Sequence, residues 1–516
     1  MQGYARDTLP TTPATVANDA PPEQVPSNVF TSATNIVMRD GIATRADGYQ
    51  ETLGTPLFEV EYLINLNEAG SNYWIYAGRD GIGVTDGQNH FDITPIEFVP
   101  TDDLNQWTGA IFNGYVLLNN GKFAPTYWPG GTNEICEPIP EWPEDYLCKA
   151  LRVFQNHIIA MDITDDVGRF RDWFIWSDAA EVGSLPETWQ AAADNEAGNA
   201  VLSATQGAII DGGALKDEFI LYKSTSTYAM RYIGGNFIFQ IRKVLDTSGL
   251  KSRNAFTESR GVHFVFTDHD IIEFDGQSYQ SLVDANNKNY LFKSLTAETA
   301  GFVFSVANTL ETEIYFFYPT APNVICNRAL VWSRDANAWG EVEIEDGVSC
   351  AARGLVPFDT GFNTWDTIPG NWNENPRKWG ETTYLTTSES ILFALPTLNQ
   401  FNNLGASVDR NGAPVSTYLL KQSIALGNEQ RRRLYKRLWP KIEGVQGTEL
   451  VFRIGAQDTP NSSIKWTEEK PFIVGESEKI DCFISGRLLC YEITSDSLQP
   501  WRLTGLDVEH NLQGGF

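Results

Sequence analysis

The chain has 516 residues, and its 38 basic and 66 acidic side chains give a formal net charge of −28. Apolar residues make up 42% of the chain and aromatic residues 12%, a composition that excludes an intrinsically disordered protein. The acidic balance argues against a protein that grips nucleic acid through a broad basic face. No apolar run approaches the roughly 20 residues of a membrane-spanning helix, and the N-terminus lacks the apolar stretch of a secretory signal. We therefore expect a soluble protein of two or three domains, or of one large repeat domain, without stable membrane insertion.

The beginning of the chain is rich in proline. Residues 5–30 hold five of the 25 prolines, together with many Thr, Ala and Asn residues. Segments of this composition tend to be extended and to build no packed core of their own. We predict an extended N-terminal arm over residues 1–30, which becomes ordered against a neighbouring molecule.

Short strand patterns dominate the next three hundred residues, and the predicted fold class is all-β. The runs are rich in Ile, Phe, Tyr and Val and are separated by Gly and Asn turns. Four examples are Glu218–Tyr222, Phe237–Val244, His263–Phe266 and Glu313–Tyr318. Helical periodicity is nearly absent; Pro186–Ala193, with Ser184 placed to cap it, predicts one short helix.

A unit of strand, Gly turn and second strand recurs along this part of the chain. Its turns contain Gly87, Gly121, Gly235 and Gly276, and Gly supplies the positive φ angles of tight hairpins. The first two glycines are 34 residues apart and the last two 41, close to the spacing of about 40 residues between propeller blades. We predict a β-propeller-like body over residues 31–349, including an N-terminal hairpin. A pair of β-sandwiches is the alternative.

Two further segments follow the predicted body. Residues 350–404 are expected to form an irregular but packed insertion, because Trp residues alternate there with Asn, Gly and Pro. Its tryptophans are Trp365, Trp372 and Trp379. From residue 405 onward, strands such as Glu449–Ile454 and Leu488–Ile493 alternate as in a β-sandwich, so we predict a C-terminal β-sandwich-like domain over residues 405–516.

Sequence motifs for catalysis or cofactor binding are not found. None of the five histidines belongs to an H-E-x-x-H pattern, and neither a G-x-S-x-G elbow nor a phosphate loop is present. The six cysteines lack zinc-site spacing and are expected to be buried free thiols. The acidic loop from Asp162 to Gly168 departs from the spacing of a calcium loop. We expect a protein that is no enzyme and uses no cofactor or metal.

One basic segment stands out from the acidic background. It places six cations in eleven residues without an acid, and the interleaved Leu, Tyr and Trp residues predict a strand. On a regular strand Arg433 and Arg437 share one face with Tyr435 and Trp439. The candidate docking residues are Arg431, Arg432, Arg433, Lys436, Arg437 and Lys441.

Two interpretations of this segment stay open. The charges protect a solvated edge strand from aggregation, or they dock onto an acidic neighbour such as a sister subunit. Phosphate binding is a weaker third interpretation.

Three stretches of the chain resemble the tail proteins of short-tailed bacteriophages. The first, residues 28–49, contains Asn35-Ile-Val-Met-Arg39-Asp40-Gly41 and Arg45-Ala-Asp-Gly48-Tyr49, which are similar to the hairpin and the Gly-aromatic turn at the start of those proteins. The second, residues 225–277, is similar to their propeller body. The third, residues 485–510, is similar to their C-terminal strands through Tyr491-Glu-Ile-Thr-Ser495 and Trp501-Arg-Leu-Thr-Gly505.

The resemblance implies a tail hub or nozzle, a ring below the portal and adaptor that retains packaged DNA and conducts it during ejection. Such proteins form homo-oligomeric rings, usually hexamers, contact tail fibre proteins and have no catalytic residues. The location implied is the virion tail, after assembly in the host cytoplasm. Acidic charge along a lumen would repel genomic DNA without sequence-specific binding.

The alternative function is a carbohydrate-active β-propeller. It would be a glycosidase or a host-glycan receptor-binding tail protein, in which exposed loop tryptophans stack on sugars. An extracellular lectin or adhesin domain is a third possibility, weakened by the missing secretory signal.

Overall fold

The computed structural model describes residues 5–68, 70–100, 107–235, 237–296, 298–357, 387–427 and 431–513. Within these ranges nearly all regular structure is β-strand, apart from one helix, α1 (Asp284–Ser294), and one 3-10 turn, η1 (Ala300–Phe302). The all-β fold class is therefore confirmed. The chain forms two compact units, one from Met1–Tyr49, Ser203–Gly347 and Ser407–Phe516, the other from Gln50–Leu202 and Val348–Ala406.

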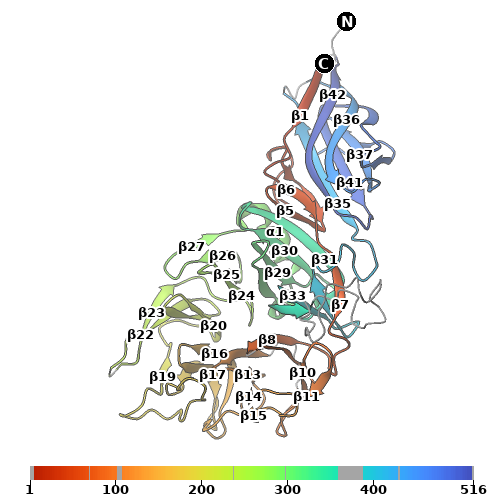
Figure 1. Ribbon diagram of the computed structural model, residues 1–516. Coiled ribbons are helices and arrows are strands. Elements are labelled where there is room, and N and C mark those ends of the chain that lie inside the picture. The colour runs from red at the N-terminus through yellow and green to blue at the C-terminus, as the bar shows by residue number, and fades with distance from the viewer. Residues whose placement is uncertain are drawn as a thin grey trace, which may run out of the picture. The chain divides into compact units, whose positions relative to one another are not determined.

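The second unit contains four-stranded antiparallel sheets in up-and-down order, the arrangement of propeller blades (Figure 1). The first comprises β8 (Tyr62–Glu68), β9 (Ser71–Ala77), β10 (Ile82–Thr85) and β11 (His90–Asp92). The next comprises β12 (Thr108–Phe112), β13 (Tyr115–Asn119), β14 (Thr126–Trp128) and β15 (Glu137–Pro138). A third comprises β16 (Leu147–Phe154), β17 (His157–Thr164), β18 (Arg169–Trp176) and β19 (Gly198–Val201).

A fourth sheet of this unit joins distant parts of the sequence. Its order is β32 (Cys350–Pro357), β33 (Thr387–Leu395), β34 (Gln400–Leu404) and β7 (Tyr49–Thr52), so a strand from the N-terminal part completes a blade built far later in the chain. The segment expected to be an irregular insertion thus supplies three regular strands. Its three tryptophans lie outside the described residues.

The first unit continues the blade pattern. One sheet comprises β20 (Ile209–Leu215), β21 (Glu218–Lys223), β22 (Thr227–Tyr232) and β23 (Phe239–Leu245). The next comprises β24 (Phe256–Ser259), β25 (Val262–Phe266), β26 (Ile271–Phe274) and β27 (Tyr279–Ser281). The strands β28 (Phe304–Asn308), β29 (Glu313–Tyr318), β30 (Cys326–Ser333) and β31 (Ala338–Val348) follow in the same order. The predicted β-propeller fold is confirmed.

The recurring glycine turns occupy two different places in the blades. Gly87, Gly235 and Gly276 lie between the third and fourth strands of their sheets, whereas Gly121 lies between the second and third. All four have positive φ angles, as the hairpin pattern predicted. The 41-residue spacing is therefore a true blade spacing, and the 34-residue spacing is not.

The C-terminal residues form a β-sandwich together with N-terminal strands. One sheet contains β35 (Thr417–Ala425), β37 (Glu449–Gln457), β38 (Lys465–Trp466), β39 (Lys470–Ile473), β41 (Leu488–Ser495) and β4 (Ser32–Thr34). The other contains β36 (Arg433–Gly444), β40 (Ile480–Gly486), β42 (Trp501–Leu512), β1 (Ala5–Leu9), β5 (Ile36–Arg39) and β6 (Ile42–Arg45). Buried apolar side chains from both sheets form one core. The second sheet continues from β5 into β31, which makes it ten-stranded.

The extended N-terminal arm is not confirmed. Strand β1 pairs with β42, and β2 (Thr15–Val16) pairs in parallel with β3 (Val29–Phe30). Leu9, Val16 and Phe30 are buried in the sandwich core. These apolar side chains, spaced between the prolines, give the segment enough buried area to pack against its own chain.

The predicted helix over residues 186–193 is wrong, and α1 was not predicted. Trp189 is buried with its ring centroid 4.7 Å from that of Trp142, and the carbonyl of Thr188 accepts a hydrogen bond from the backbone N–H of Asp178. Tertiary contacts thus hold this segment in a non-helical conformation, although the sequence predicted a helix. The helix α1 is held instead by Asn287, which donates to the Val16 carbonyl at 2.8 Å and accepts from the N–H of Asn18 at 2.9 Å.

Candidate assembly surface

The basic segment forms β36, an interior strand of the ten-stranded sheet. It pairs with β42 on one side and with β40 on the other. The interpretation as a solvated edge strand is therefore wrong, because both backbone edges are occupied and no charge is needed to keep another chain away. In this part of the described sheet the terminal strand is β40.

A β-bulge in β36 changes which side chains share a face. The register against both neighbours shifts between Tyr435 and Arg437. Arg433 and Tyr435 are buried before the bulge, and Leu438 is buried after it. The predicted common face is thus wrong beyond Tyr435, because the extra residue, Lys436, moves Arg437 to the outer surface. The buried Arg433 is unsuited to a docking role.

The outward cations of β36 are paired within the chain. Arg437 Nε lies 3.0 Å from Asp481 Oδ1, and Arg437 Nη1 lies 3.4 Å from Glu509 Oε2. Lys441 Nζ lies 2.9 Å from Asp507 Oδ1. Carboxylates therefore alternate with cations across β36, β40 and β42, which disfavours phosphate binding on this face.

Strand β1 adds to the same surface. Arg6 Nη2 lies 2.8 Å from Asp507 Oδ2, and its guanidinium lies 4.1 Å from the ring centroid of Trp439. Burial alone would raise the pKa of Asp507, but hydrogen bonds from Lys441, Thr8 and Arg6 hold it below its ordinary value. We refer to the side chains of Arg6, Arg437, Trp439, Lys441, Asp481, Asp507 and Glu509 as the outer charged face.

Arg431 and Arg432, at the start of the basic segment, also lie outside this face. Arg432 pairs with Asp458 at 3.3 Å, and Arg431 is exposed at the start of the strand. Arg431 and Lys441 are thus the predicted docking residues that are exposed to solvent. The acidic partners come from β40, from β42 and from the loop after β37, so the basic run by itself does not reveal them.

His263 and the six cysteines have structural surroundings. His263 is buried and bonded to Tyr222 Oη at 2.8 Å and to the Ala214 carbonyl at 2.9 Å, and burial lowers the pKa of its imidazole to about 4. All six cysteines are buried and free. Burial raises the pKa of the Cys490 thiol to about 11, which leaves it protonated at neutral pH.

Metal ligation finds no support in the described part of the chain. There, no group of three His, Cys, Asp or Glu side chains is placed to hold an ion. In the acidic loop, Asp162 is buried and paired with Arg169, while Asp165 accepts hydrogen bonds from the N–H groups of Val167 and Gly168. The described helices likewise include none with the length and apolarity needed to traverse a membrane.

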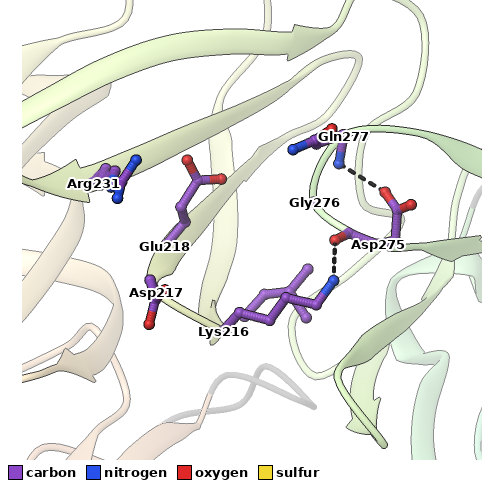
Figure 2. A pocket seen from close by; sticks show the side chains of 8 residues that line it. Lys216, Asp217, Glu218, Arg231, Asp275, Gly276 and Gln277 are labelled. Atoms are coloured by element: carbon purple, nitrogen blue, oxygen red, sulfur yellow. Dashed lines mark hydrogen bonds between the residues drawn. The ribbon is translucent and has the colours of Figure 1, made fainter.

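A small open pocket of about 390 Å³ lies between the turns of two neighbouring blades. Figure 2 shows Lys216 reaching from the β20–β21 turn to the backbone carbonyl of Asp275, with Nζ 2.9 Å from the oxygen. Beside it, Arg242 Nη2 lies 2.6 Å from Glu218 Oε2 and 3.3 Å from the Gly276 carbonyl. These charges tie one blade to the next, and we interpret the pocket as structural.

The chain has weak structural similarity to some solved structures. No family model and no curated protein sequence matches the chain. Among solved structures, the WD40 β-propeller domain of Doa1 is similar at 10% identity and TM-score 0.39, covering 69% of this chain and 96% of that one. YCF48 bound to D1 peptide is similar at 10% identity and TM-score 0.34, covering 57% and 86%. A puromycin hydrolase is similar at 10% identity and TM-score 0.38, covering 72% and 59%.

Proposed function

We propose that this chain is a structural subunit of the tail nozzle of a short-tailed bacteriophage. In this proposal it forms a homo-oligomeric ring, with six copies as the expected number, below the portal and adaptor proteins. The ring retains packaged DNA and conducts it during ejection, with tail fibre proteins bound at its side. The protein acts without catalysis or cofactor, in the virion tail, after assembly in the host cytoplasm.

The pairing of the basic segment with carboxylates of its own chain is the observation that most favours a protein that conducts DNA over one that binds it. The chain carries 28 more acidic than basic charges, and its most basic run is largely neutralised by its own carboxylates. A protein that holds DNA needs cations free to contact phosphates. A channel that lets DNA slide needs the opposite, since each phosphate contact would slow the passage.

Subunit contacts are proposed at the outer charged face and at the adjacent Arg431. Mixed surfaces of this kind favour specificity and association rate, because a neighbour must match the alternation of sign. A ring uses two different surfaces of each subunit in head-to-tail contact. The partner surface would therefore lie elsewhere on the sister subunit.

The decisive experiment is the mass of the purified full-length chain in solution. Light scattering would be recorded for the protein alone and after mixing with portal–adaptor particles. A ring of six, or a monomer that assembles only on the portal, is expected. A chain that stays monomeric in both samples contradicts the proposal. Filter retention of duplex DNA at 150 mM salt serves as the second readout, with no retention expected.

A further inference from the structure

A cavity of about 540 Å³ opens in the first unit at the end of β31, beside the start of β35 and the loop of residues 407–416. Its volume lies in the range of roughly 300–1,000 Å³ typical of small-molecule sites. The wall groups used below are Tyr49, Glu343, Glu345, Asp346, Arg410 and Tyr418. They come from three distant parts of the sequence, so no local motif indicates the site.

Arg410 is held rigidly on one wall of the cavity. Its Nη2 donates to Asn35 Oδ1 at 2.7 Å, and its guanidinium lies 5.6 Å from the ring centroid of Tyr49. Burial lowers the pKa of Arg410 although acidic groups lie nearby, so the guanidinium sits where water is scarce. Its buried Nε has no hydrogen-bond partner among the described residues. A buried N–H without an acceptor costs free energy, and a ligand oxygen would relieve that cost.

Three carboxylates line the same cavity, at the end of β31. Glu343 is also paired with Arg328 at 3.2 Å, while Glu345 is exposed. Against the single guanidinium of Arg410 they make the cavity acidic, which disfavours an anionic ligand. A metal ion is disfavoured as well, since no group of ligands in the described residues is placed to hold one. A wholly apolar ligand would cover these charges and offer them no hydrogen bonds in place of water.

We propose that this cavity binds a short neutral or amino-substituted saccharide. The half-buried aromatic ring of Tyr418 offers a surface for the apolar face of a pyranose ring. Sugar hydroxyls both donate and accept hydrogen bonds, so they can donate to the carboxylates and accept from Arg410. This proposal is independent of the proposed nozzle function, because it rests on the residues that line one cavity and not on ring assembly.

The test is saturation-transfer NMR and titration calorimetry on the full-length protein. The probes are glucose, glucosamine, N-acetylglucosamine and, as the anionic comparison, galacturonic acid. We expect at least one of the first three to bind, and galacturonic acid to bind more weakly. No binding by any of the first three, or preferred binding of galacturonic acid, overturns the proposal.

Two variants test whether the sugar binds in this cavity. Arg410→Gln is expected to weaken binding about tenfold or more, because it removes a charge-assisted donor. Glu345→Gln changes an exposed side chain, keeps its shape and is expected to weaken binding about threefold to tenfold, so the test stands even if Arg410→Gln fails to fold. Glu443→Gln, at an exposed position of β36, is the matched control and should bind as the parent protein does. Equal affinity in Glu345→Gln and the parent contradicts the proposal.

The affinities for a longer and a shorter saccharide distinguish a polysaccharide ligand from a free sugar. Tighter binding of a tetrasaccharide of the preferred sugar than of its monomer supports a polysaccharide as the ligand. Equal affinities support a free sugar.

Discussion

The two ends of the ten-stranded sheet hold their ion pairs in opposite surroundings. At the blade end, Arg39 Nε lies 2.8 Å from Glu313 Oε1 and Arg328 Nη1 lies 3.1 Å from Glu341 Oε1, and both carboxylate side chains are at most 2% exposed. At the sandwich end, Arg437 and Lys441 form pairs of similar length. These cations are 39% and 49% exposed, whereas Arg39 and Arg328 at the blade end are 17% and 26% exposed.

Burial therefore decides what each end of the sheet contributes. Buried pairs join the β5 hairpin and α1 to the blade, and losing one partner there leaves a charge away from water. Exposed pairs are screened by solvent and salt and add little to stability, so the sandwich face is free to serve contacts with other molecules.

The largest expected effect is at Glu341. Its carboxylate accepts from Arg328, from Tyr290 Oη at 2.8 Å and from Tyr318 Oη at 3.2 Å. Glu341→Ala should lower the free energy of unfolding by about 3 kcal/mol, because the partly buried guanidinium keeps only Glu343 as a counter-ion and the two tyrosine hydroxyls lose their acceptor. Urea denaturation of the parent and the variant measures the difference.

The matched control removes both charges. The double variant Arg328→Met/Glu341→Leu should be more stable than Glu341→Ala by about 1 kcal/mol or more, because both buried members of the pair are gone and Glu343, which loses Arg328, is 30% exposed to water. If the single and double variants lose the same free energy, the charge argument is wrong and lost packing explains the effect.

The second effect is a pH dependence that arises in the blade core. Burial holds the pKa of His263 at about 4, below its ordinary 6.5. Between these values the unfolded chain binds a proton that the folded chain does not, so the free energy of unfolding falls as the pH drops. Between pH 7 and pH 5 the parent should lose about 2 kcal/mol more than His263→Gln. Identical pH profiles from urea denaturation would contradict this assignment.

The smallest effect on stability is expected at the sandwich end. The double variant Arg437→Gln/Lys441→Gln should impair ring or portal assembly in a salt-dependent way, while its urea midpoint stays close to that of the parent. Native mass spectrometry at low and high salt measures the assembly. Unchanged assembly would remove the outer charged face from the proposed subunit contacts. A large fall in the urea midpoint would instead show that this end resembles the blade end.

Much of the blade architecture could be predicted from local patterns. The runs at Glu218–Tyr222, His263–Phe266 and Glu313–Tyr318 each form strands, because alternating apolar residues and glycine turns act over a few neighbouring positions. The helix prediction was wrong because it also used local patterns alone. The residues of α1 carry weak helical signals, and the contact of Asn287 with Val16 that holds α1 comes from a distant part of the chain.

The candidate sites were predictable to different degrees. The six cations of β36 are visible as a run of letters, and their place on a strand follows from the interleaved apolar residues. Which of them face outward depends on a bulge between Tyr435 and Arg437, and two neighbouring strands set that bulge. The cavity around Arg410 has no local signature, since Tyr49 and Glu345 join it from elsewhere in the chain.

By itself, the sequence determined the fold class, the positions of most strands and turns, and the acidic character of the protein. These properties depend on residue type and on spacing within a hairpin, where interactions are short in sequence. Tertiary structure alone decided the pairing of β1 with β42, the completion of a late blade by β7, the burial of Arg433 and the cavity around Arg410. Each of these brings together residues that are dozens to hundreds of positions apart, and their energies depend on burial that no local pattern contains.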